Sequence, residues 1–228
     1  MPHRPPPRGR ASAASTKPAP APEATRDQIL AEAARLFRLQ GYAATTLRQI
    51  AEAADIKAGS IYYHFGSKDE ILGVVLDAGI EAVTTAVKSR IAALPPGASY
   101  RERIGAAIEG HLYGLLHHGD FTSANIRNYG QIPLAAKNRH RLVRRGYAQY
   151  WDDLLSEAQA SGALRADASL AVMRLYLIGA LNWTVEWYNP QRGSFKTFAA
   201  QISTIVFDGI GAPAVRAAAP ARRSRAHR

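Results

Sequence analysis

The sequence predicts an all-α protein with a small three-helix unit at the N-terminus and a larger helical domain after it. Apolar residues recur at helical spacing from about residue 25 to residue 208. Hydroxyl residues stand at several expected helix starts, and glycine or proline at the expected ends. With 228 residues, 47% of them apolar, the chain can form one or two domains with a buried core.

Composition excludes several classes of protein. The chain has no cysteine, which rules out disulfides, thiolate zinc sites and cysteine nucleophiles. Its first ten residues are polar and proline-rich, unlike a signal peptide. The most apolar stretch, residues 170–188, is interrupted by Arg174, Asn182 and Glu186, so no membrane span is expected. We therefore expect a cytoplasmic protein that does not bind membranes.

The formal net charge of +11 is concentrated at the two ends of the chain. Residues 1–22 hold four basic residues, residues 213–228 hold five, and neither segment contains an acid. Both segments are rich in proline and alanine, so we expect two disordered basic arms. Such arms can add sequence-independent affinity for DNA, or they can simply aid solubility. Net charge alone does not decide between these roles.

Three capping-box patterns mark expected helix starts in the first 70 residues. They are Thr25-x-x-Gln28, Thr46-x-x-Gln49 and Ser67-x-x-Glu70, spaced 21 residues apart. In this motif a hydroxyl caps a backbone N–H three residues on, and the residue at that position caps back. Each pattern precedes apolar residues at helical spacing, so together they give a strong boundary signal.

Residues 23–70 are expected to form a helix-turn-helix domain. A first helix from Thr25 ends at Gly41, with one apolar face formed by Ile29, Ala33, Leu36 and Phe37. A short second helix buries Leu47, Ile50, Ala51 and Ala54. Asp55 and Ile56 then form a tight connection to a third helix, residues 57–65. Two short helices joined by a tight turn and braced by another helix are typical of the motif.

The exposed face of the third helix is unusual in composition. Small residues come first and are followed by three polar rings: Lys57, Ala58, Gly59, Ser60, Tyr62, Tyr63 and His64. Small residues let a helix approach base edges closely, while tyrosine and histidine can reach phosphates. An ordinary surface helix with aromatic packing is the alternative, and the helix-turn-helix context favours DNA binding.

Residues 45–72, TTLRQIAEAADIKAGSIYYHFGSKDEIL, resemble the DNA-binding signature of the TetR/AcrR repressors. The resemblance implies an all-helical dimer that places two recognition helices in successive major grooves. It implies that Arg48, Lys57, Ala58, Gly59 and Ser60 face bases and that Tyr62 lies at the border between bases and backbone. The residues implied to hold phosphates are Thr46, Tyr63, His64 and Lys68. No acid or second histidine shares the helix face of His64 at ligand spacing, so we do not expect a metal site there.

Residues 71–212 are expected to form a ligand-binding and dimerisation domain. A long fourth helix runs from Ser67 to about Leu94, where Pro95, Pro96 and Gly97 end it. Such a helix can transmit a tilt from the second domain to the DNA-binding domain. Further helices are expected near residues 100–118 and 123–129, and from Pro133 to about Ser161.

The last two expected helices, residues 168–188 and 194–208, differ from the others. The first is apolar nearly all the way round, which predicts burial on two sides. Its own core on one side and a second subunit on the other would satisfy this pattern. That interpretation agrees with the four-helix dimer interface of the resembling family. A core formed entirely within one chain is the alternative.

A basic cluster suggests the class of effector. Arg139, Arg141, Arg144 and Arg145 crowd the start of the helix from Pro133, where the helix dipole disfavours cations and a bound anion would offset the cost. Residues 174–190, RLYLIGALNWTVEWYNP, are similar to TetR-type regulators of fatty-acid and steroid breakdown, several of which sense acyl-coenzyme A thioesters. The arginines could then meet the phosphates, and Trp183 or Trp187 could line the acyl end. The alternative is a solvated basic face in a regulator of efflux or stress genes that senses a neutral or aromatic compound.

Catalytic motifs are missing from the sequence. It contains no paired carboxylates, nucleophile elbow or phosphate-binding glycine loop, and His111, His117 and His118 lack metal-ligand spacing. We therefore expect no enzyme activity, cofactor or metal. The expected function is a ligand-responsive regulator, a repressor that binds a palindromic DNA operator as a homodimer and is released by a small effector. An enzyme on a helical fold and a constitutive DNA-organising protein are the rivals.

Overall fold

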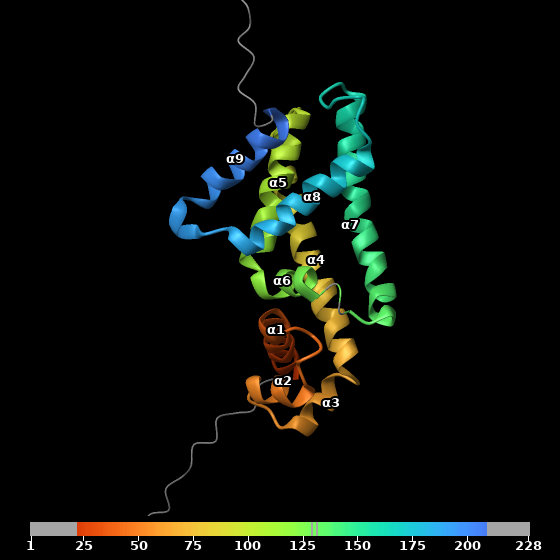
Figure 1. Cartoon of the computed structure of the whole chain (residues 1–228), viewed down its shortest axis with the longest axis vertical. Helices are drawn as coiled ribbons and strands as arrows, with labels where there is room; N and C mark the ends of the chain where they lie inside the picture. The colour runs from red at the N-terminus through yellow and green to blue at the C-terminus, as the bar shows by residue number, and fades with distance from the viewer. Residues whose placement is uncertain (1–21, 129, 131, 209–228) are drawn as a thin grey trace, which may run out of the picture.

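The computed structural model describes residues 22–128, 130 and 132–208, and all regular elements in these residues are helices (Figure 1). The basic arms expected at residues 1–22 and 213–228 lie outside the described residues, apart from Pro22 at the start of the first helix. The prediction of an all-α fold is confirmed.

The N-terminal unit contains α1 (Pro22–Gln40), α2 (Leu47–Ala53), the 3-10 turn η1 (Ala58–Ser60) and α3 (Ile61–His64). Its core consists of fully buried side chains from each helix, including Phe37, Ile50, Ile61 and Phe65. Gly41 ends α1 in the left-handed conformation, with φ 85°. The apolar pattern of the sequence therefore identified this core correctly.

The capping predictions have mixed outcomes. Thr46 and Gln49 form the expected reciprocal box at α2. Ser67 caps α4, but the Glu70 carboxylate accepts from the Gly66 N–H at 2.8 Å rather than from that of Ser67. The prediction at Thr25 is wrong, because α1 already begins at Pro22 and Thr25 lies in its first turn. Proline is favoured at a first helical position because its missing N–H would be unbonded there anyway.

The third segment is less regular than the single helix expected over residues 57–65. One 3-10 turn, Ala58–Ser60, leads into one α-helical turn, Ile61–His64, and Phe65 is extended. Asp55 supplies the sharp turn before it with a left-handed φ of 53°. Glycine and serine are weak helix formers, which accounts for the tighter first turn.

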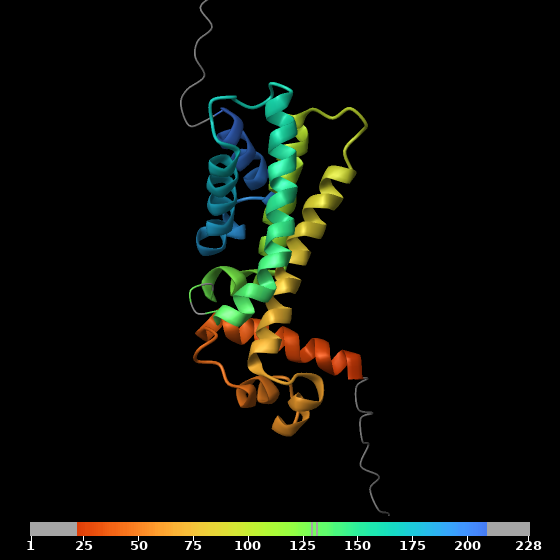
Figure 2. The same cartoon turned by 90° about the vertical axis from the view of Figure 1, so that its right-hand side faces the viewer.

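Helix α4 (Lys68–Ala92) belongs to both halves of the molecule. Ile71, Leu72 and Leu76 lie in the N-terminal core, while Val83 and Val87 lie in a second core. Figure 2 shows this helix rising from the N-terminal unit along α5 and α7. Because it is continuous, a tilt at one end displaces the other.

The second core is formed by α5 (Tyr100–His117), α7 (Leu134–Ala160), α8 (Leu170–Trp187) and α9 (Phe195–Asp208), together with α4. Gly110 and Gly114 let α5 approach α4 closely, since a Cβ on them would lie 2.6 and 2.7 Å from the Cα atoms of Val87 and Val83. A 3-10 turn, η3 (Pro190–Arg192), connects α8 to α9.

Helix α6 (Gly119–Asn128) lies between the two halves, against α1 and α4 (Figure 1). Asp120 forms an ion pair with Arg38 of α1. Asn125 donates a hydrogen bond to the Leu76 carbonyl of α4 at 2.8 Å. A change in α6 can therefore reach the N-terminal unit through two contacts.

Helices α8 and α9 leave a large apolar face exposed. In α8 only Leu177, Leu181 and Thr184 are buried. The exposed side chains of α8 recur at helical spacing: Val172, Leu175, Tyr176, Trp183 and Trp187. Ile205 and Val206 of α9 are exposed as well. The expected burial on both sides is thus absent within the single chain. None of the helices in the described residues is long and apolar enough to cross a membrane.

Candidate DNA-recognition surface and effector cavity

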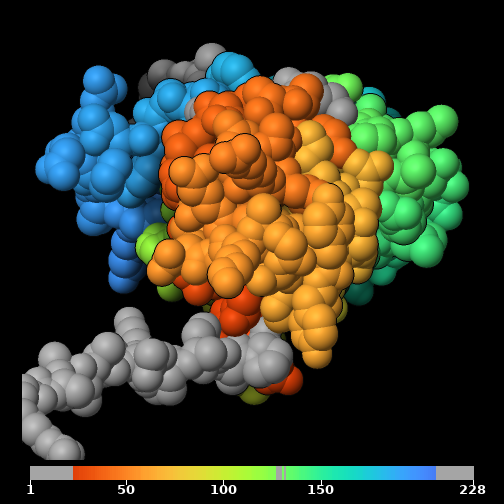
Figure 3. All heavy atoms as spheres, turned by 90° about the horizontal axis from the view of Figure 1, so that it is seen from below, coloured from red at the N-terminus to blue at the C-terminus, as the bar shows by residue number. Residues whose placement is uncertain are grey.

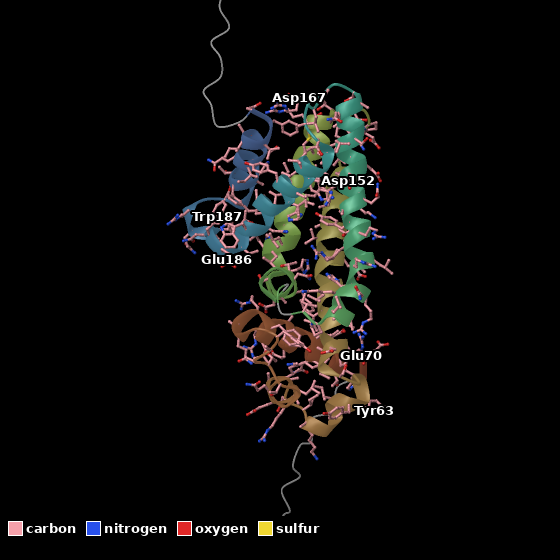
Figure 4. All side chains as sticks on the ribbon, turned by 45° about the vertical axis from the view of Figure 1, so that its right-hand side comes forward. Tyr63, Glu70, Asp152, Asp167, Glu186 and Trp187 are labelled. Atoms are coloured by element: carbon pink, nitrogen blue, oxygen red, sulfur yellow. The ribbon has the colours of Figure 1, made fainter. Side chains whose placement is uncertain are left out.

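One end of the molecule gathers most of the residues expected to bind DNA. Figure 3 views this end and shows that α2, η1 and α3 (orange) form much of its surface. The exposed members are Thr46, Arg48, Lys57, Ala58, Gly59, Ser60, Tyr62 and Tyr63. Tyr63 is 85% exposed and projects from the lower end of the molecule (Figure 4). These side chains are free of the core that holds the helices in place.

Gly59 has no packing partner that explains it. A Cβ on this residue would meet no atom within 4 Å, and no left-handed backbone requires a glycine there. A glycine in a helix costs roughly 1 kcal/mol relative to alanine. Close approach of an external partner, such as the edge of a DNA groove, would account for it.

His64 and Lys68 differ from the exposed group. His64 is half-buried, with its ring edge-on to Tyr63 at 5.4 Å. The Lys68 ammonium donates to the carbonyls of Tyr42 and Thr45 at 2.8 and 2.6 Å and lies 4.2 Å from the Tyr42 ring centre. Burial lowers the pKa of Lys68. Lys68 therefore ties the α1–α2 connection to α4, and one of its three N–H donors remains for a phosphate.

Tyr42 completes this contact between α4 and the α1–α2 connection. Its hydroxyl donates to the Asp69 carboxylate, next to Lys68. Burial and this hydrogen bond raise the pKa of Tyr42 well above its usual range. The expectation for Lys68 considered only DNA and missed its structural role, because the partners are backbone atoms 23 and 26 residues away.

A cavity of about 350 Å³ lies in the second half of the molecule. Ligand pockets in proteins measure about 300–1,000 Å³, so its size suits a small effector. Five helices, α4 to α8, line it. Its apolar wall is formed by Ile80, Val83, Leu115, Ile126, Ala148, Leu175 and Ile178. Its polar lining is formed by His111, Thr122, Asn125, Arg144, Tyr147, Arg174 and Asn182.

A hydrogen-bonded network forms part of the polar lining. His111 Nδ1 lies 2.6 Å from the Tyr147 hydroxyl, and His111 Nε2 lies 3.1 Å from Asn182 Oδ1. Burial lowers the pKa of His111 to about 4, so the ring is neutral at pH 7. Burial also raises the pKa of Tyr147, so its phenol stays protonated. The network is therefore uncharged.

Two cations lie at the cavity. Arg174 of α8 forms an ion pair with Asp152 of α7, with 2.7 Å between Nε and Oδ1. Arg144 of α7 is exposed and lines the cavity as well, so it lies at the rim. Leu175 and Gly179 are also exposed lining residues and mark the same rim on α8. No acidic side chain is part of this lining among the described residues.

The cavity includes only one of the residues expected to bind the effector. Arg144 lines it, whereas Arg139, Arg141 and Arg145 are exposed on α7 and do not. The argument from the helix dipole is also weaker than expected. Helix α7 begins at Leu134, and the dipole acts mainly within the first turn, so all four arginines lie beyond its reach.

The two tryptophans lie elsewhere. Trp183 is 63% exposed and outside the cavity lining, and Trp187 packs against Phe198 of α9 at 5.6 Å between ring centres. Figure 4 shows Trp187 close to α9.

The sequence analysis did not assign the hydrogen-bonded cavity residues His111, Tyr147 and Asn182 to the effector site. These residues come from separate helices, so no local motif joins them. The one available signal was the presence of polar residues within apolar helical faces, as at His111 and Asn182.

The comparisons with known families agree with this architecture. Residues 29–75 match the family described as bacterial regulatory proteins, tetR family. Residues 97–210 match the tetracyclin repressor-like C-terminal domain. The chain belongs to the TetR family. The resemblance noted at residues 45–72 is thus confirmed and extends to the helices that surround the cavity.

Individual members of the TetR family are similar over most of their length. The transcriptional repressor KstR2 of Rhodococcus jostii (strain RHA1) is 26% identical over 82% of this chain and 92% of its own. The structure of the ketosteroid transcriptional regulator KstR2 of Mycobacterium tuberculosis has a TM-score of 0.68 at 24% identity, over 81% of this chain and 93% of that one. AibR, solved with isovaleryl coenzyme A and operator DNA, has a TM-score of 0.69 at 21% identity, over 80% and 98%.

Proposed function

We propose that this TetR-family protein is a repressor that binds a palindromic operator as a homodimer and is released by a small effector. One observation carries the proposal. Helix α4 begins at Lys68, next to the recognition segment, and its residues Gly79, Ile80 and Val83 line the cavity. A ligand in the cavity therefore contacts the helix whose other end positions the exposed recognition face.

The exposed face of α8 and α9 supports the dimer. Its apolar side chains form a continuous helical stripe, and contiguous apolar surface of this kind marks a protein interface. Gly179 and Ala180 lie in the middle of the stripe and permit close approach of another helix. Two subunits joined here would present two recognition segments to one operator, with half-sites about one helical turn apart.

The cavity supports an effector with an apolar body and an anionic or thioester end. Arg144 and Arg174 lie in a lining whose other members are apolar or uncharged, and Arg174 is held by its ion pair with Asp152. At about 350 Å³ the cavity suits an acyl group, so the nucleotide of an acyl-coenzyme A would remain outside, near the exposed Arg139, Arg141 and Arg145. The AibR complex shows that a protein of this fold can combine operator DNA with a coenzyme A thioester.

The division of the chain follows from this proposal. Residues 23–70 bind DNA, residues 71–212 bind the effector and the second subunit, and the basic arms add salt-dependent affinity for DNA. The protein acts in the cytoplasm as a regulator without enzyme activity, cofactor or metal. The relatives named above are transcription regulators, which supports this assignment.

The test is release of operator DNA by matched acyl-coenzyme A thioesters and free acids. A footprint on the operator should be two-fold symmetric, and thioesters should release the DNA. Arg144→Ala should weaken the release of DNA by the thioesters and by the free acids, because Arg144 lines the cavity. Arg141→Ala combined with Arg145→Ala should weaken only the thioesters, because these side chains lie outside it.

Other outcomes would overturn parts of the proposal. A footprint without two-fold symmetry contradicts the dimeric operator complex. If only neutral or aromatic compounds release DNA, the arginines form a solvated face and the protein is a regulator of the efflux or stress type.

A further inference from the structure

The His111–Tyr147–Asn182 network has a defined polarity. Asn182 Oδ1 can only accept a hydrogen bond, so His111 donates its Nε2–H to it. A neutral imidazole carries one N–H, so Nδ1 accepts from the Tyr147 hydroxyl. Both ring nitrogens are thereby used, and His111 has no capacity left for a ligand.

The two flanking residues retain capacity toward the cavity. Tyr147 Oη keeps a lone pair that can accept, and no partner for the Asn182 amide nitrogen is found among the described residues. If the Asn182 amide turns over and His111 changes tautomer, every bond in the network reverses. Tyr147 then offers a donor and Asn182 an acceptor. In either state the cavity wall presents one donor and one acceptor.

This pattern matches an uncharged oxygen better than a charged one. A hydroxyl can donate to one member and accept from the other, and a carbonyl can accept from whichever is the donor. A carboxylate, like a carbonyl, can only accept, but its negative charge would lie against an uncharged network, which costs more than the burial of a neutral oxygen. A hydrocarbon group leaves the amide donor without a partner, which is unfavourable when buried.

The rings around the network hold it rigidly. His111 stacks on Tyr147 at 5.9 Å with 27° between planes, and Trp151 lies edge-on to both. The three residues come from α5, α7 and α8, so the network also joins three walls of the cavity. One of these helices, α7, also contributes the buried Ala136 to the core of the N-terminal unit.

We propose that the His111–Tyr147–Asn182 network is the recognition site for an uncharged oxygen, a hydroxyl or ketone, on the buried part of the effector. The inference rests on the proposed function, because it assigns specificity within the same effector cavity. It adds a second polar anchor at the network to the anion site proposed at Arg144 on the rim. The effector class is therefore an apolar skeleton that carries a neutral oxygen as well as its anionic or thioester end.

The test uses four cyclohexane fragments without DNA: cyclohexanol, cyclohexanone, methylcyclohexane and cyclohexanecarboxylate. Their dissociation constants are measured by ¹H–¹⁵N chemical-shift titration, in which backbone amides of the cavity residues report binding in every protein. The alcohol-to-hydrocarbon affinity ratio should fall about tenfold in Tyr147→Phe and in Asn182→Leu. Cyclohexanone should lose affinity in Asn182→Leu as well, whereas cyclohexanecarboxylate, whose charge Arg144 can bind, should keep its affinity in both variants.

Ile80→Val is the matched control, since Ile80 lines the same cavity but lies outside the network. It should leave the ratio within about twofold of the wild type. Circular dichroism confirms that each variant is folded, and the half-buried Asn182 provides a second variant if Tyr147→Phe does not fold.

Three results would overturn the inference: an unchanged ratio in the folded network variants, an equal loss of carboxylate and alcohol affinity in those variants, or no binding by any fragment. Because no DNA is present, these results are separate from a failure of operator release. If acyl-coenzyme A thioesters do not release DNA, the thioester proposal is wrong. A tenfold change in the alcohol-to-hydrocarbon ratio would still support the oxygen site at the network.

Discussion

The recognition surface and the effector cavity use polar residues in opposite ways. At the recognition surface the polar side chains are exposed, and separate apolar residues such as Phe37 and Ile61 hold the helices together. In the cavity, His111 and Tyr147 are buried and bonded to each other. Substitutions at the surface should therefore change function with little effect on stability. Substitutions in the cavity should change both.

The largest expected effect concerns an exposed residue that should matter for dimerisation and operator binding but not for the stability of the single chain. Tyr176 is 76% exposed on the α8 face. Tyr176→Arg should leave the subunit folded but place an unpaired charge in the proposed dimer interface. Such a charge costs about 3–5 kcal/mol, which weakens dimerisation roughly 10²–10⁴-fold. Sedimentation should show monomers, and operator affinity should fall sharply.

Leu142→Arg is the control for this prediction. Leu142 is 71% exposed on α7, away from the α8 and α9 face, so its substitution should leave the dimer intact. A dimeric Tyr176→Arg protein would place the interface elsewhere. Ile202→Arg, a natural choice from the sequence alone, is less informative because Ile202 packs against the core of its own subunit.

The second prediction concerns pH and the buried cavity. Burial lowers the pKa of His111 from its ordinary value of 6.5 to about 4. As the pH falls below 6.5, the unfolded chain binds a proton at this histidine that the folded chain does not. Stability should therefore fall with pH in the window from 6.5 to 4, by about 2 kcal/mol between pH 6.5 and 5. About one pH unit above 6.5 and beyond, this group contributes little pH dependence, because it is neutral in both states.

Urea unfolding at pH 7.5, 6 and 5 measures this dependence. His111→Gln should be less stable than the wild type at pH 7.5 and should show a shallower loss at lower pH. His140 is a second buried histidine with a lowered pKa, and it remains in both proteins. Equal slopes in the two proteins would show that His111 does not titrate in this range.

The difference between the two regions also explains what the sequence could predict. The recognition surface depends on caps, a turn and short apolar faces within 45 residues, so local patterns such as Thr46 with Gln49 were sufficient. The cavity depends on residues up to 71 positions apart, such as His111 and Asn182. Helical spacing places each residue on a face, but it does not determine which faces meet. For that reason the sequence named Arg144, together with three other arginines of the same helix, as an effector residue. It did not identify Arg174 or the His111–Tyr147–Asn182 network as part of the cavity.

The exposed stripe of α8 was predicted less well than the recognition surface but better than the cavity. The sequence correctly showed that this helix is apolar nearly all round. It could not show which part faces its own core, because Leu177 and Trp183 look alike in an apolar pattern. Trp183 was therefore assigned to the ligand although it lies on the exposed face.

The smallest expected effect compares two lysines within the DNA-binding unit. Lys57 is exposed, whereas Lys68 donates to two backbone carbonyls. Lys57→Ala should leave stability within about 0.5 kcal/mol but weaken DNA binding, because it removes an exposed cation that faces the bases. Lys68→Ala should lower stability by about 1–2 kcal/mol, because it leaves two carbonyls without their charged donor. Urea unfolding and operator binding at several salt concentrations separate the two effects.

If Lys68→Ala kept full stability and only changed the salt slope, its contacts with Tyr42 and Thr45 would be incidental and phosphate binding would be its main role. If instead both variants lost stability equally, the recognition surface would not be independent of the core, and the contrast with the cavity would fail.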